Sequence, residues 1–152
     1  MPVVIVYALA HAVGALKAAA RAGRPIVLAS AADAGDYAGP GWFKELVEAA
    51  REAVPAADCS SLLDCGASVG AALAAIRVQV DGVVFTGGAD TARRLADIAG
   101  QHGVHFQTRR PTPTIDLAGA FFASAEQVER CCRRLLERGG HAAAPASPTP
   151  RA

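Results

Sequence analysis

The sequence predicts an α/β protein with a mostly parallel sheet of five or six strands and flanking helices. Three observations predict this class. Short apolar, β-rich runs recur along the chain, amphipathic helical patterns lie between them, and glycine or proline stands at many of the boundaries. Strand and helix patterns that alternate in this way are typical of parallel sheets joined by right-handed crossovers.

The apolar runs predict five strands, at residues 3–7, 25–30, 61–65, 82–86 and 104–107. Each run is continuous rather than alternating, which is typical of strands with both faces buried, so we expect helices on both sides of the sheet. Residues 109–114 contain two prolines and are therefore excluded from a central strand. Residues 115–122 are expected to form a sixth, edge strand or an extended segment. This order suits half of a TIM-type barrel or a flavodoxin-like open sheet.

Five helices are predicted between and after these strands, at residues 11–22, 40–50, 67–80, 91–101 and 124–139. The first ends at Gly23, a residue favoured after helix C-termini. The last opens with Ser124 and Gln127 at capping-box spacing and ends at a glycine pair. We expect a single domain over residues 1–140 and a disordered tail over residues 141–152, because the tail has little to bury.

Composition narrows the classes of partner and location. The 152 residues are 52% hydrophobic and carry 15 basic and 14 acidic side chains, with a net charge of +1. This balance indicates neither a nucleic-acid nor a membrane partner. The apolar start of the chain lacks the basic flank of a secretory signal, so a cytoplasmic location is expected. Four cysteines without metal-binding spacing indicate no metal site, and no cofactor is identified.

Residues 60–66, with the sequence SSLLDCG, bring an acid, a thiol and a glycine to the end of a strand. Binding groups in parallel α/β proteins collect at such carboxyl ends. Asp64 is a candidate general acid or base, although an acid here could instead cap the next helix, a role for which Ser68 competes. Cys65 is a second catalytic candidate, or a buried inert thiol. Alternation places these two side chains on opposite faces if the strand continues.

Further candidate binding groups follow two other strands. Thr86, Gly87 and Gly88 lie between a strand and a helix, where free backbone N–H groups favour a phosphate or carboxylate, or simply make a tight turn. Ser30 lies at the root of a long loop, residues 31–41, that could close over a ligand. His11 could join a site at the same edge.

Three segments carry a resemblance to a known family. They are Leu63-Asp64-Cys65-Gly66, Ala75-Ile76 and Val83-Val84-Phe85-Thr86-Gly87. With them, residues 3–107 resemble the first half of a class II, metal-dependent fructose-bisphosphate aldolase. The resemblance implies a proton-donor role for Asp64, and it places Cys65 where the family has a zinc-binding histidine. Because a catalytic zinc site needs three protein ligands, Cys65 alone cannot supply one.

These features lead to three hypotheses about function. The first is a small cytoplasmic protein that binds a small anionic metabolite, a carbonyl or phosphorylated compound, between Ser30, Asp64 and the Gly87–Gly88 turn. The second is a lyase or isomerase that uses Asp64 as acid and base. The third is a non-catalytic accessory protein. We also expect a homo-oligomer, because a half-barrel has open sheet edges.

Overall fold

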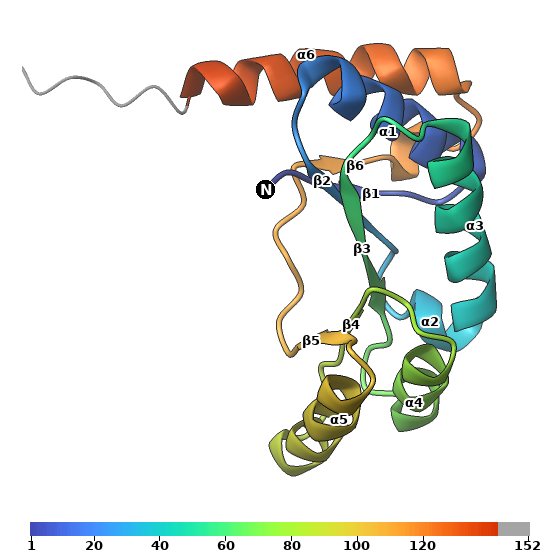
Figure 1. The fold of residues 1–152 in the computed structure, drawn as a ribbon, viewed down its shortest axis with the longest axis vertical. Coiled ribbons are helices and arrows are strands. Elements are labelled where there is room, and N and C mark those ends of the chain that lie inside the picture. Colours follow the sequence, from blue (N-terminus) through green and yellow to red (C-terminus); the bar gives the residue numbers. More distant parts are fainter. Residues whose placement is uncertain (143–152) are drawn as a thin grey trace, which may run out of the picture.

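The computed structural model describes residues 1–142, with side chains through residue 138. Strands and helices alternate along most of the chain, as predicted (Figure 1). In order the elements are β1 (Val3–Ile5), α1 (Leu9–Ala22), β2 (Ile26–Ala29), α2 (Ala34–Tyr37), α3 (Pro40–Ala53), β3 (Cys59–Asp64), α4 (Val69–Arg77), β4 (Gly82–Val84), α5 (Ala89–Gln101), β5 (His105–Gln107), β6 (Ile115–Asp116), the 3₁₀ turn η1 (Ala118–Ala120) and α6 (Ala125–Ala142).

All six strands are parallel and form one sheet in the order β5-β4-β3-β2-β1-β6. The predicted fold class is confirmed. Strands β1 to β5 lie side by side in chain order, as they do in part of a TIM-type barrel, whereas a flavodoxin-like sheet would have the order 2-1-3-4-5. The flavodoxin-like alternative is therefore wrong. The sixth strand is shorter than predicted and pairs with β1 at the far edge.

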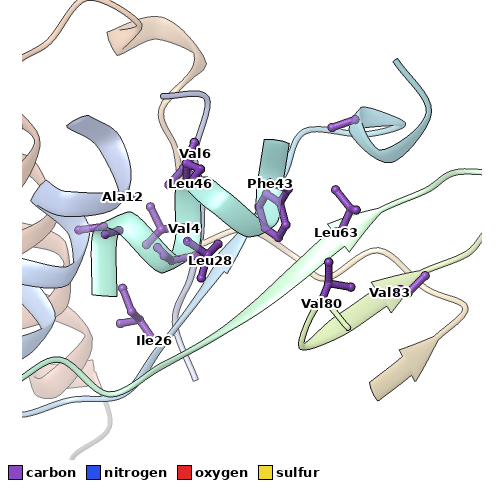
Figure 2. Packing of buried hydrophobic residues seen from close by; sticks show 14 of the residues in the cluster. Val4, Val6, Ala12, Ile26, Leu28, Phe43, Leu46, Leu63, Val80 and Val83 are labelled. Carbon is purple, nitrogen blue, oxygen red and sulfur yellow. The ribbon is translucent and has the colours of Figure 1, made fainter. Parts of the chain in front are cut away.

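The expectation that helices cover both faces of the sheet is also wrong. Helices α2, α3 and α4 lie on one side of the sheet in Figure 1, and side chains from α1, α3, α4, α5 and α6 join a single large core on that side. Figure 2 shows Phe43 and Leu46 of α3 packed among strand residues such as Leu28 and Leu63. The opposite face holds a separate, smaller cluster made only of strand residues: Val3, Ala29, Leu62 and Val84, with Ile5 and Val27 partly buried.

The opposite face is covered by the link between β5 and β6, residues 108–114, which we call the strap. These strands lie at opposite edges of the sheet, so the strap spans five strand spacings, about 24 Å. The eight steps from Gln107 to Ile115 reach about 28 Å when fully extended, so the strap must run almost straight. Pro111 and Pro113 favour this extended backbone. The continuous apolar runs thus reflect burial by helices on one face and by the strap on the other.

Several boundaries differ from the prediction. The long loop at residues 31–41 contains the short helix α2, and α3 begins at Pro40. The predicted capping box is present at the start of α6: the backbone N–H of Ser124 donates to Gln127 Oε1 (2.8 Å), and that of Gln127 donates to Ser124 Oγ (3.2 Å). Helix α6 continues through the glycine pair to Ala142. The rest of the predicted tail, residues 143–152, lies outside the described residues. No helix within residues 1–142 is both long and apolar enough to cross a bilayer.

Candidate functional site

The structure brings several predicted site residues to the carboxyl ends of neighbouring strands. Ser30 follows β2, Asp64 ends β3 and Thr86 follows β4. Backbone and side-chain hydrogen bonds join them: the Asp64 N–H donates to Ser30 Oγ (2.9 Å), and the Thr86 N–H donates to the Gly66 carbonyl (2.8 Å). All strands of a parallel sheet have their carboxyl ends on the same side, so these groups lie together at that end of the sheet.

Asp64 is the centre of the most connected polar cluster at this edge. Its Oδ1 accepts hydrogen bonds from the backbone N–H groups of Asp33 (3.0 Å) and Gly66 (2.9 Å). Its Oδ2 accepts from Arg110 Nε at 2.6 Å, and Arg110 Nη2 lies 3.3 Å from Oδ1. The Asp64 side chain is 7% exposed, whereas that of Arg110 is 45% exposed. The carboxylate is therefore held by two backbone donors and one guanidinium group.

Asp33 and Gly66, whose backbone N–H groups donate to Asp64, both have unusual backbone conformations. Asp33 has φ 62° and Gly66 has φ 55°, both in the left-handed region that disfavours most side chains. Gly66 has a second constraint, because a Cβ added there would lie 1.9 Å from Asp33 Oδ1. Asp33 Oδ1 itself accepts from Arg110 Nη2 (3.2 Å). Arg110 therefore ties the strap to both β3 and the loop after β2.

A cavity of about 260 Å³ lies between the sheet and the strap. Its walls are mostly apolar, and three polar side chains stand among them: Ser30, Asp64 and Arg110. The apolar lining residues come from four strands or their ends and from the strap, and are Ile5, Ala29, Ala32, Leu62, Val84, Pro111 and Pro113. Alternation along β3 explains the placement of Asp64, because Leu62 and Asp64 face the cavity while Leu63 faces the helices.

Arg110 lines the cavity, and the sequence did not predict it as a site residue. It lies 46 residues from Asp64 in a segment recognised only as irregular. The pKa of Arg110 is raised, first by its hydrogen bond to Asp64 and then by the charges of Asp64 and Asp33, while burial opposes the shift. The one signal in the sequence was a basic residue directly before a proline in a segment unable to join the sheet.

Cys65 does not join the cavity. Its side chain is fully buried in the helix-covered core, on the face opposite Asp64. Burial, with the nearby charges of Asp64 and Asp36, raises the pKa of this thiol to about 12. A thiol in this setting is a weak nucleophile, because the reactive thiolate is rare at neutral pH. The catalytic hypothesis for Cys65 therefore has no support in its placement.

Thiol labelling tests this placement. At about pH 8 we expect Cys131, which is exposed, to react with a disulfide reagent, whereas Cys65 and Cys132 should react at least about a hundredfold more slowly in the folded protein. Burial raises the pKa of both protected thiols to about 12. Labelling sites are located by peptide mass spectrometry, with urea-unfolded protein as the control in which all four cysteines react. Rapid labelling of Cys65 in the folded protein would contradict its position in the core.

The residues predicted to bind a phosphate or carboxylate, Thr86, Gly87 and Gly88, lie beside the cavity rather than in its wall. Thr86 is exposed, and Gly88 precedes the first residue of α5. Gly87 packs against its neighbour Phe85, since a Cβ added there would lie 2.4 Å from that ring. None of these three residues lines the cavity beneath the strap. The predicted Gly-Gly turn is thus at the same edge as Asp64 but forms a separate surface.

His11 and Tyr7 form a structural contact at the end of β1. Fully buried His11 accepts the Tyr7 backbone N–H at Nδ1 (3.1 Å), and its Nε2 lies 2.9 Å from the carbonyl of Ala120. One ring nitrogen thus joins α1 to the end of β1, and the other joins α1 to η1. The Tyr7 hydroxyl donates to Asp116 (2.8 Å). Burial, followed by this hydrogen bond, raises the pKa of Tyr7 to about 12.

Asp64 does not cap the following helix. Ser68 does, because its Oγ accepts a hydrogen bond from the Ala71 backbone N–H at 3.1 Å.

The zinc site that the resemblance to class II aldolases implies does not fit the structure. Cys65 faces the core, and within residues 1–142 no group of three or more histidine, cysteine, aspartate or glutamate side chains is placed to hold a metal ion. What the arrangement offers chemically is a small apolar cavity with a carboxylate–guanidinium pair at one end.

Comparison with known proteins shows a structural likeness but no match in sequence. No protein-family model matches the sequence, and no curated protein matches it. Among solved structures, a protein assigned as a fructose-1,6-biphosphate aldolase from Coccidioides immitis superimposes with a TM-score of 0.51 and 17% sequence identity. The match covers 70% of this chain and 44% of that chain, so it spans less than half of the larger protein. At this identity the likeness concerns the fold alone, and this chain has a distant aldolase-like α/β fold.

Proposed function

We propose that this protein binds a small carbonyl metabolite, neutral or with a single negative charge, in the cavity beneath the strap. The observation that carries the proposal is the polar end of this cavity. Arg110 uses Nε and Nη2 for Asp64 and Asp33, while Nη1 makes no hydrogen bond within the described part of the chain. A carbonyl or carboxylate oxygen of a ligand could accept a charge-assisted hydrogen bond from Nη1.

The size and charge of the cavity support this class of ligand. A volume of about 260 Å³ lies just below the range of about 300–1,000 Å³ typical of drug-sized ligand pockets, so it suits a metabolite of a few carbon atoms. Two aspartates surround one arginine, so the cluster carries a net negative charge that disfavours a doubly charged phosphate group. The phosphorylated alternative depends on Gly87 and Gly88, which lie outside the cavity wall.

Binding is favoured over catalysis by the state of Asp64. An acid–base residue needs a lone pair or proton within reach of the substrate. Both oxygens of Asp64 already accept hydrogen bonds from Gly66, Asp33 and Arg110. A substrate would have to displace Arg110 before this carboxylate could exchange a proton with it.

A substitution at the cavity mouth tests the proposal. Ala32 is exposed and lines the cavity, so Ala32→Leu is expected to fill its entrance while leaving the fold intact. Ala38→Leu is the matched control, because Ala38 is exposed in the same loop region but does not line the cavity. Binding of hydroxyacetone, pyruvate and dihydroxyacetone phosphate is measured by ligand-observed NMR.

We expect hydroxyacetone or pyruvate to bind wild type and Ala38→Leu equally, with at least about a tenfold loss in Ala32→Leu, which corresponds to about 1.4 kcal/mol. Equal binding to Ala32→Leu would place the ligand elsewhere. Preference for dihydroxyacetone phosphate would favour the Gly87–Gly88 turn. Failure of every probe to bind would favour the accessory-protein hypothesis, and turnover of a probe would favour the lyase or isomerase.

A further inference from the structure

Strand β5 leaves one edge of the sheet open. Within residues 1–142 it pairs with β4 on one side and with no strand on the other. The chain then turns into the strap instead of forming a helix, so no other element of residues 1–142 covers the flank of α5 and β5. A groove of about 710 Å³ lies along this flank, between Ala89, Ala92, Arg93 and Ala96 of α5 and residues 105–109 of β5 and the strap. This groove is distinct from the cavity beneath the strap.

The backbone of β5 presents its free hydrogen-bonding groups at one residue. The His105 N–H donates to the Asp81 carbonyl (2.9 Å), and the Gln107 carbonyl accepts from the Phe85 N–H (3.0 Å). Successive residues of a strand direct these groups to opposite sides. Since His105 and Gln107 face β4, the N–H and carbonyl of Phe106 face outward, and they lie at the centre of the strand.

We propose that a second copy of this chain occupies the edge, related by a two-fold axis beside Phe106. Antiparallel pairing about this axis lets the Phe106 N–H donate to the carbonyl of Phe106 of the partner subunit, while the reverse bond forms by symmetry. The same register sets His105 opposite Gln107 of the partner subunit. Both side chains can form hydrogen bonds, as their contact within one chain shows (3.1 Å). The two sheets then become one continuous sheet.

The surface of α5 is complementary to its own symmetry copy. Ala89 and Ala96 are exposed on one face, with buried Ala92 between them, and small side chains there let two helices approach closely. Arg93 and Asp97 are both exposed and four residues apart, and Arg93 also pairs with Asp90 of its own helix, so its second face is the one turned toward Asp97 of the partner subunit. When α5 packs antiparallel to its copy, Arg93 meets Asp97 of the partner subunit, and symmetry makes this pairing twice. A second copy therefore satisfies the backbone, the groove and the charges together.

Sedimentation equilibrium of the full chain at micromolar concentrations tests this interface. Wild type is expected to be a dimer. Ala96→Arg, at an exposed position in the groove, is expected to shift it to monomer, because it adds bulk and a third cation beside Arg93 and Arg109. Ala53→Arg, at an exposed alanine on α3, is the matched control and should remain a dimer. Amide hydrogen exchange gives a second readout: the Phe106 N–H should be protected in wild type and exchange at least about tenfold faster in Ala96→Arg.

Each contrary result overturns the proposal. A monomeric wild type removes it directly. If Ala96→Arg stays dimeric with a protected Phe106 amide, copies associate through another surface, such as exposed Phe121 and Phe122 (52% and 96% exposed). If both arginine variants become monomeric, the effect is not specific to the groove. None of these outcomes depends on ligand binding beneath the strap, so the two proposals fail independently.

Discussion

Asp64→Ala is expected to lower the free energy of unfolding by about 3 kcal/mol, because it leaves a buried N–H donor unsatisfied and breaks charge-assisted hydrogen bonds. The Gly66 N–H loses its acceptor inside the protein, and Arg110 loses its strongest partner. The loss lies at the lower end of the range for such a pair because Arg110 is half exposed and water can replace part of the contact. Urea denaturation followed by circular dichroism measures the change.

Two further variants separate the stability contributed by the buried Asp64 hydrogen bonds from that of the exposed Asp33–Arg110 ion pair. Asp64→Asn keeps one oxygen for the backbone donors but turns an N–H₂ group toward Arg110, so a loss of about 1–2 kcal/mol is expected. Asp33→Asn is the control for the exposed ion pair: the Asp33 side chain is 60% exposed, and asparagine tolerates its left-handed conformation, so the change should stay within about 0.5 kcal/mol. An alanine variant as stable as wild type would contradict the role of Asp64 as the anchor of strap and loop.

Gly14→Ala is expected to destabilise the protein by about 2–3 kcal/mol through overpacking of two helices. Gly14 is buried in α1, where an added Cβ would lie 2.5 Å from the Ala125 carbonyl oxygen and 2.7 Å from Val128 Cβ. Both contacts belong to the start of α6, one of them to its backbone, so a rotamer change cannot relieve the clash. Thermal and urea denaturation measure the loss.

Gly70→Ala is the matched control for this prediction. Gly70 lies within α4, and a Cβ added there meets nothing within 4 Å. Alanine is a better helix former than glycine, so Gly70→Ala should stabilise the protein by about 0.5–1 kcal/mol. Opposite signs for the two substitutions would show that the close approach of α1 and α6, rather than helix propensity, governs position 14. Equal gains in stability would contradict that packing.

The sequence by itself determined the local elements and their order. Continuous apolar runs marked the first five strands, glycine and proline marked many boundaries, and Ser124 with Gln127 marked the start of α6. Alternation along β3 also determined that Asp64 and Cys65 point to opposite faces. These signals are readable because they depend on neighbours within a few residues, where backbone geometry ties spacing to direction.

Only the tertiary structure decided what covers each face of the sheet and what surrounds Asp64. Burial makes a strand apolar whether helices or an extended segment cover it, so the apolar runs could not show that the strap, rather than a second layer of helices, closes one face. The Arg110–Asp64 pair joins residues 46 positions apart, and it forms because the strand order sends the chain from β5 across the sheet to β6. Strand order depends on long-range pairing, and no local spacing in the chain encodes it.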